Sequence, residues 1–380
     1  MNAKLRRTLH LVLFLLLPVV TPWRVNAADM YVYFGTQRSG PDIGFSLAHF
    51  DSDTGKLTTP EFIMEAVQPA YFVIHPDGRH LYACNSGKSN DTASAYEIDP
   101  KTGKLTLLNQ KSTGSFGPNY IALDQTARYA LIANYYGGSV AVLPIKSDFS
   151  FDDRTGFDQH TGKSVNPERQ SKPYAHSVAV DSSNRFALVA DLGLDKVFVY
   201  RFNAKDGSLT PNDPPFAAVK PGSGPRHVKF HPSDRWVYVI NEMGCTITGF
   251  NWNPAKGSLT EFQTVPTLPG GFNGTNTCAE LVIHPNGRFL YGSNRGHDSL
   301  AVFAIDQASG KLTLVERVSS QGRWPRTLVF DPTGQWLLCA NHNSDNAVVF
   351  RVDGGTGKLT QADPPVKVPY PFCARFLPVP

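Results

Sequence analysis

The sequence has 380 residues, and 41% of them are hydrophobic, which is enough to bury a large core. Four of its 36 Lys and Arg residues lie within residues 1–27, which contain no Asp or Glu, so the rest of the chain carries 32 charges of each sign. This balance gives no basis for nucleic-acid binding, which depends on an excess of basic residues. Five cysteines without a CxxC pair exclude a disulfide-rich scaffold and give no zinc motif.

The first 27 residues have the order of a secretory signal peptide. Three basic residues within the first seven positions precede an apolar run over residues 11–20, and small residues end the segment at Ala27. The apolar run is about half as long as the roughly 20 residues that a membrane-spanning helix needs. We therefore predict a signal peptide at 1–27, a single domain at 28–380, and a periplasmic or secreted protein without membrane attachment after cleavage.

Six segments of the remaining chain follow one template, HPxGRxLYxxN or a variant that begins with Asp. They start at His75, Asp124, Asp181, His231, His284 and Asp331. Successive starts are 47 to 57 residues apart, and a second motif, TGKLT or GSLT, recurs between most of them. A period of this length is typical of repeat proteins.

Each repeat has the pattern of β-strands. Segments such as RFLYGSN alternate large or β-branched residues with small ones, and the HPxG segments supply the residues of tight turns. TGKLT is a hairpin turn that leads into another strand. Four strands in about fifty residues, repeated along a chain, are typical of the blades of a β-propeller.

The two ends of the chain each carry part of a seventh repeat. YVYFGT at 31–36 matches LYACNS at 81–86, and PFCARFLP at 371–378 matches PRHVKFHP at 225–232. Pairing the two ends would close the ring and remove its exposed sheet edges. We predict an all-β, seven-bladed β-propeller with four-stranded blades, in which N- and C-terminal strands share the last blade.

The strand that runs into each HP or DP turn should line the central channel. Two of its positions vary among the blades and carry polar or charged residues, including Asn119, His176, Arg226, His227, Glu280 and Arg326. A third variable position follows a recurring Asn and holds Glu242 and Arg295. Buried charges are costly unless they are paired or used. These side chains therefore predict either a functional site on the ring axis or an ion-pair network that fills the channel.

Several motifs together resemble the seven-bladed propeller lactonase family. They are YVYFGT, TGKLT, HPDGR, QHTGKSVNPERQ, GSGPRH, INE, NRGHDS and WPR, in this order over nearly the whole chain. The family includes bacterial 6-phosphogluconolactonases and fungal carboxymuconate-lactonizing enzymes. The resemblance implies a catalytic site, because a His, two Arg and a Glu are implicated in the lactonizing branch.

Motif by motif, these four catalytic residues fall on His176, Arg226, Glu242 and Arg295. One departure is Tyr174 at the rim of the pocket, which stands where relatives often have His. In a lactone hydrolase, Glu242 or His176 could act as the general base. The arginines could hold the oxyanion or a substrate carboxylate or phosphate. We predict that substrate is bound by His227, Arg326, Glu280, Asn119 and Arg169, the last from an insertion over residues 148–172.

Three functions remain open at this point. A lactone hydrolase similar to 6-phosphogluconolactonase is favoured, and export suggests an unphosphorylated sugar lactone or another cyclic ester as its substrate. A muconate-type cycloisomerase would use the same residues, and a non-catalytic propeller would bind a ligand or protein on one face. We expect a monomer without a cofactor, with a calcium site at Glu280 and Asn119 as the alternative.

Overall fold

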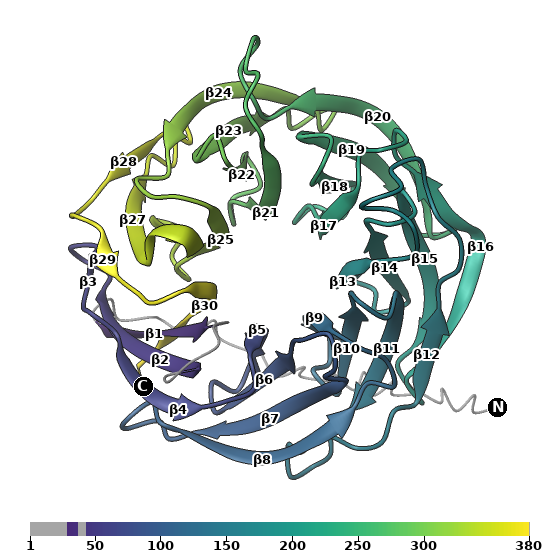
Figure 1. Ribbon diagram of the computed structural model, residues 1–380, viewed down its shortest axis with the longest axis horizontal. Coiled ribbons are helices and arrows are strands. Elements are labelled where there is room, and N and C mark those ends of the chain that lie inside the picture. The colour runs from purple at the N-terminus through teal and green to yellow at the C-terminus, as the bar shows by residue number, and fades with distance from the viewer. Residues whose placement is uncertain (1–28, 37–42, 380) are drawn as a thin grey trace, which may run out of the picture.

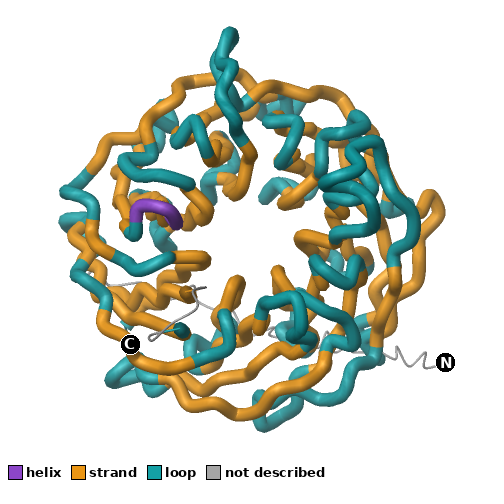
Figure 2. The backbone as a smooth tube through the Cα atoms, in the orientation of Figure 1, coloured by secondary structure: helices purple, strands orange, loops and turns teal. Residues whose placement is uncertain are grey.

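Seven antiparallel β-sheets surround a central axis in the computed structural model, which describes residues 29–36 and 43–379 (Figure 1). The predicted signal peptide lies outside the described residues. Strands make up the ring, and the described part contains one helical segment, the short 3-10 turn η1 (His342–Ser344) (Figure 2). None of the described helices has the length and apolarity to cross a membrane. The predicted all-β, seven-bladed propeller is confirmed.

Five blades consist of four strands that follow one another in the chain, from the axis to the rim. The first two are β5 (Pro69–Ile74), β6 (His80–Asn85), β7 (Thr92–Ile98) and β8 (Leu105–Ser112), then β9 (Pro118–Leu123), β10 (Tyr129–Asn134), β11 (Ser139–Pro144) and β12 (Gly156–Gln159). The next two are β13 (Ala175–Val180), β14 (Phe186–Asp191), β15 (Lys196–Asn203) and β16 (Ser208–Ala218), then β17 (Pro225–Phe230), β18 (Trp236–Asn241), β19 (Thr246–Asn253) and β20 (Ser258–Pro266). The fifth is β21 (Thr277–Ile283), β22 (Phe289–Arg295), β23 (Ser299–Ile305) and β24 (Leu312–Ser319).

The outer strand of each of the two remaining blades is broken into two pieces. The sixth blade has β25 (Pro325–Phe330), β26 (Trp336–Asn341) and β27 (Asn346–Val352), with β28 (Leu359–Gln361) and β29 (Val366–Lys367) both paired to β27. The seventh has β30 (Pro371–Pro378), β1 (Asp29–Thr36) and β2 (Gly44–Asp51), with β3 (Lys56–Leu57) and β4 (Glu61–Glu65) both paired to β2.

The seventh blade closes the ring with strands from both ends of the chain. The C-terminal strand β30 pairs antiparallel with β1, with Met30 opposite Pro378 and Gly35 opposite Cys373. The C-terminus therefore supplies the innermost strand and the N-terminus supplies the outer ones, as predicted (Figure 1). Closure by hydrogen bonding between the two ends leaves no open edge between the first and last repeats.

The recurring motifs hold neighbouring blades together. In the SGKLT turn, the Gly310 carbonyl accepts a hydrogen bond from the Tyr238 hydroxyl of the preceding blade at 2.6 Å. Gly310 has a φ of +73°, and a Cβ there would lie 2.6 Å from the Trp236 ring, so both conformation and contact require glycine. The second strand of each of the six internal repeats, such as β6, is buried along its whole length because a sheet covers both of its faces.

Candidate functional site

The innermost strand of each blade begins with a β-bulge. In the β17–β18 pair, Pro225 lies opposite Asn241 and His227 opposite Ile240, so Arg226 has no partner residue. The same shift in register occurs in five other blades, where the unpaired residues are Ala70, Asn119, His176, Arg326 and Phe372. In the remaining blade, which contains β21 and β22, Ala279 and Glu280 share one partner residue. Because a bulge redirects a side chain out of the regular alternation, the first variable position faces the axis.

The bulged residues surround one narrow pocket on the axis of the ring. Its wall takes at least one side chain from each of the seven blades, among them Ala70, Asn119, His176, Arg226, Glu280, Arg326 and Phe372. His227, which follows the bulge, also lines the pocket. Six of the nine predicted site residues thus meet around one space. The other three, Glu242, Arg295 and Arg169, are connected to it through Arg226.

Glu242 is the centre of an ion cluster with three arginines. Its Oε2 accepts a hydrogen bond from Nε of Arg226 at 2.9 Å and lies 2.9 Å from Nη2 of Arg295. Its Oε1 accepts one from Nη2 of Arg169 at 2.5 Å. Burial alone would raise the pKa of Glu242, but the charges of Arg295, Arg226 and Arg169 outweigh it and hold the pKa at about 2. Glu242 is therefore an ionised anchor, with both oxygens occupied.

His227 and Glu280 form a second buried pair. Nδ1 of His227 lies 2.6 Å from Oε1 of Glu280, and its Nε2 lies 3.1 Å from Nη1 of Arg226. Burial lowers the pKa of His227 to about 3, so its ring is neutral near pH 7. The neutral ring can donate from Nδ1 to the carboxylate and accept at Nε2 from the guanidinium. This arrangement holds His227 in one tautomer and links it to the arginine cluster.

His176 is the neutral imidazole that lines the pocket without a carboxylate partner among the described residues. Burial first, and then the charges of Arg226 and its neighbours, lower the pKa of His176 well below its ordinary value. The amide nitrogen of Asn119 lies 3.2 Å from Nδ1. The side-chain NH2 of Asn119 can donate a hydrogen bond to this nitrogen, or, if the amide is rotated by about 180°, its oxygen can accept one. Asn119 can therefore pair with either tautomer of the His176 ring. His176 is thus unprotonated at neutral pH and able to take up a proton.

Arg326 differs from the other arginines of the site. Its guanidinium carbon lies 3.4 Å from the centre of the Phe372 ring, and none of the ion pairs in residues 29–36 and 43–379 includes it. Burial and the nearby charges of Arg226 and Arg295 lower the pKa of Arg326 well below its usual range. A guanidinium in this surrounding would be stabilised by an anion entering the pocket.

Tyr71, Tyr120 and Phe372 contribute to the site although charge patterning did not single them out. The rings of Tyr71 and Tyr120 stack at 4.0 Å, and both lie edge-on to His227. They occupy the same variable positions of the repeat as the predicted residues, so these positions could have identified them as site residues from the sequence. Within the predicted insertion, residues 156–159 form the outer strand β12, and Arg169 contacts Glu242 of the site.

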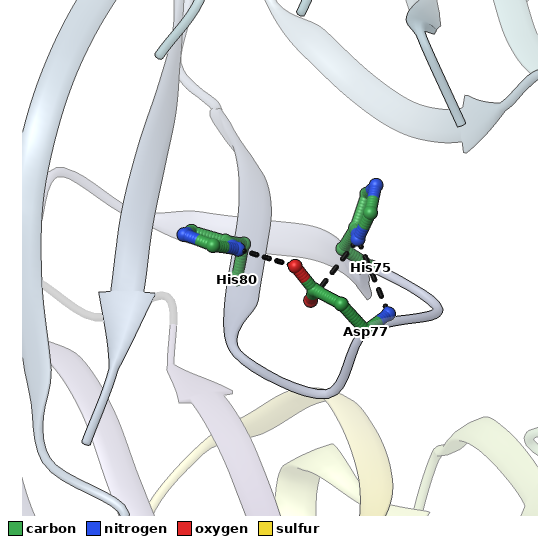
Figure 3. Close-up of side chains that lie close together, drawn as sticks. All are labelled: His75, Asp77 and His80. Carbon is green, nitrogen blue, oxygen red and sulfur yellow. Dashed lines mark hydrogen bonds and ion pairs between the residues drawn. The ribbon is translucent and has the colours of Figure 1, made fainter. Parts of the chain in front are cut away.

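One group of side chains in the described part of the chain could hold a metal ion, and it lies in an HPxG turn. Asp77 lies between His75 and His80, at 3.0 Å and 2.7 Å from their Nδ1 atoms (Figure 3). Nδ1 of His75 also accepts the backbone N–H of Asp77, and His231 and His284 accept the equivalent N–H in their own turns. These contacts explain the cluster as part of the turn.

The fold and the site together define a seven-bladed propeller with an axial pocket rich in arginine and histidine. Residues 31–376 match the family model described as lactonase, 7-bladed beta-propeller, and the chain belongs to this family. It is 36% identical over 345 residues to 6-phosphogluconolactonase of Bacillus subtilis (strain 168), covering 91% of this chain and 97% of that protein. The protein is accordingly a lactonase.

Two solved structures support the same assignment. The periplasmic gluconolactonase of Pseudomonas aeruginosa is 34% identical, with a TM-score of 0.87, and the match covers 93% of this chain and 100% of that one. A putative 6-phosphogluconolactonase from Bacteroides fragilis is 30% identical, with a TM-score of 0.84, over 94% and 99% of the two chains. Family membership favours an enzyme over a non-catalytic binding propeller.

Proposed function

We propose that the protein hydrolyses a sugar lactone in the axial pocket, with His176 as the general base. The observation that carries this proposal is the contrast between His176 and Glu242, the two candidate bases. Both oxygens of Glu242 are committed to arginines, whereas His176 is neutral and lines the pocket, and among the described residues its ring has one amide within hydrogen-bonding range. A general base must be unprotonated and within reach of a water molecule next to the substrate.

The proposed reaction adds one water molecule across the ester bond. His176 takes a proton from water as the oxygen attacks the lactone carbonyl, and Arg326 stabilises the oxyanion that forms. The hydrogen bonds of Arg226 to protein acceptors use Nε and Nη1, so its Nη2 is placed to assist. When the ring C–O bond breaks, His176 returns the proton to the departing alkoxide, which yields the open hydroxy acid. Arg295 and Arg169 act through Glu242, which holds Arg226 in position.

For the substrate we favour an unphosphorylated aldonolactone. Three of the four arginines of the candidate site contact Glu242, and Arg326 lines the pocket outside these ion pairs, so Arg326 is the guanidinium placed for the carbonyl oxygen. The name of the Pseudomonas relative, a periplasmic gluconolactonase, supports this choice, as does the predicted export signal. The name of the Bacillus relative supports 6-phosphogluconolactone as the second candidate. We further propose that the protein works outside the cytoplasm as a monomer.

A panel of lactones tests the substrate and the need for a metal. We expect the highest kcat/KM with glucono-δ-lactone, a lower value with 6-phosphogluconolactone, and no lactone formation from a muconate. Addition of EDTA should leave the rate unchanged within about twofold, because the guanidinium groups already supply the positive charge that a metal would give. A loss of activity with EDTA that calcium restores would support the alternative site at Glu280 and Asn119. Lactone formation from a muconate would identify a cycloisomerase.

The pH dependence of kcat/KM should reflect the low pKa of His176. Because the pKa of His176 lies well below 6.5, its imidazole is still unprotonated at pH 6.5 in the free enzyme. The value of kcat/KM should therefore be constant between neutral pH and 6.5 and should fall only in more acidic solution. The falling limb should correspond to protonation of a single group. A midpoint at or above the ordinary histidine value of about 6.5 would argue against His176 as the base.

A further inference from the structure

An aspartate connects each of three blades to the next one. This aspartate lies four residues after the recurring Asn or Asp near the end of the second strand, and its φ is positive. Its side chain accepts a hydrogen bond from the backbone N–H of a residue in the next blade. That residue directly precedes the proline with which the innermost strand of the next blade begins. The pairs are Asp195 with Gly224 at 2.7 Å, Asp298 with Trp324 at 2.8 Å, and Asp345 with Tyr370 at 2.9 Å. The aspartate and the start of the next strand therefore face each other across the junction between blades.

At one junction the aspartate position and the position of the proline that opens the next strand both hold cysteine. Cys245 occupies the aspartate position and keeps the positive φ, at +48°. Cys278 occupies the position that is proline in five of the other six blades. Two departures from the repeat thus occur together, at the two places that meet across the same junction, which links the blade of β17–β20 to that of β21–β24.

The two thiols share one hydrogen-bonded environment. The Thr267 hydroxyl donates to the Cys245 carbonyl at 2.9 Å and lies 3.2 Å from Sγ of Cys278. The Asn276 amide donates to Sγ of Cys245 at 3.2 Å and to Oδ1 of Asn294 at 3.4 Å, and that oxygen accepts from Sγ of Cys278 at 3.3 Å. The contacts place both sulfur atoms in one small polar space.

Their surroundings give the two sulfurs different reactivity. The adjacent Cys278 thiol, and then the hydrogen bond from the Asn276 amide, lower the pKa of Cys245 to about 6 against the effect of its burial. Cys245 is partly exposed, whereas Cys278 is buried and burial raises its pKa. A partly exposed thiolate with a buried thiol beside it is the arrangement of an attacking and a resolving cysteine. Cys84, Cys339 and Cys373 are buried, and burial raises the pKa of each, so they are unreactive by comparison.

We propose that Cys245 and Cys278 are a reactive dithiol that a small-molecule or protein disulfide converts into a disulfide between two blades. The Cys245 thiolate attacks one sulfur of the reagent, forms a mixed disulfide and releases one thiol. Cys278 then gives up its proton and attacks Sγ of Cys245, which releases the second thiol. Two protein thiols are oxidised and one reagent disulfide is reduced to two thiols. An exported protein would meet such oxidants outside the cytoplasm.

The new bond would join two backbone segments that support the ion cluster. Cys245 lies three residues after Glu242, and the N–H of Cys278 donates to the Glu242 carbonyl at 2.9 Å. The Cys278 carbonyl accepts from Nη2 of Arg295 at 2.8 Å. A bond between residues 245 and 278 would also close a loop in the unfolded chain and so lower its conformational entropy, which should raise Tm by roughly 5 °C.

Oxidised glutathione at neutral pH, applied to the whole folded protein, tests the proposal. The wild type should lose two of its five free thiols and two hydrogen atoms of mass, and a peptide map should connect Cys245 to Cys278. Cys278→Ser should instead retain one glutathione on Cys245, because the resolving thiol is gone. Cys339→Ser, a buried cysteine of the next blade, is the matched control and should cross-link like the wild type.

Three results would overturn the proposal: five thiols that persist in the oxidised buffer, glutathione that accumulates on wild-type Cys245 without a cross-link, or a bond between other cysteines. If Cys278→Ser does not fold, the peptide map and thiol count of the wild type decide alone. Neither measurement depends on lactonase activity, so the result is independent of the proposed function.

Discussion

Replacing His176 by Asn should lower kcat by about 10²- to 10⁴-fold, the contribution expected of a positioned general base. The KM should change much less, because Asn keeps a polar group next to Asn119 and the arginines of the pocket remain. The wild-type acid limb of the pH profile should disappear along with the activity. Steady-state kinetics with the best lactone of the panel, measured across the pH range, checks each of these points.

A matched control for this variant is His75→Asn. His75 is also an imidazole in a repeat, but it lies in a turn between β5 and β6, outside the pocket wall. Its replacement should leave kcat within a few fold of the wild type. A His176→Asn protein that is folded and retains more than about a tenth of kcat would show that the base is another group.

Of the single substitutions considered, Glu242→Gln should lower the free energy of unfolding the most. The amide keeps the shape of the side chain but leaves two buried guanidinium groups and one partly exposed one without a counter-charge. Removing one partner of a buried ion pair costs about 3–5 kcal/mol of unfolding free energy. Displacement of Arg226 should also lower kcat/KM by about 100-fold, as a shift of about 1 Å in a positioning group can. Urea unfolding and steady-state kinetics measure the two losses.

A second substitution separates charge from shape at this position. Arg169 is partly exposed, so Arg169→Ala alone should cost under about 1 kcal/mol. In the Glu242→Gln background the same change removes one of the three repelling cations and should restore part of the lost stability. Glu61→Gln, on the exposed β4 strand, is the control and should have no effect. Additive losses in the double variant would contradict an electrostatic role for Glu242.

The repeat made most of the fold predictable. The HPxG turns, the TGKLT hairpins and the alternation of large and small residues are local signals, and their spacing gives the number of blades. The matches of residues 31–36 and 371–378 to internal repeats predicted the closed seventh blade, which β1 and β30 form. Comparison among repeats also predicted six residues that line the axial pocket, because positions that vary within a repeated frame are free of the demands of the scaffold. The outer strand β12 could not be predicted from the repeat, since it lies in an insertion without a counterpart in the other blades.

The partners and protonation states of the site residues could not be predicted in this way. Glu242 pairs with side chains 16, 53 and 73 residues away, and its choice among them depends on distances across blades. The alternation of a strand does not predict the bulges that turn Arg226, His176 and Arg326 toward the axis. The sequence by itself determined the ring and the strand positions that line its axis, because a local pattern repeats from blade to blade. Only the tertiary structure decided that Glu242 is a saturated anchor and His176 a neutral imidazole, because burial and neighbouring charge set the pKa of each.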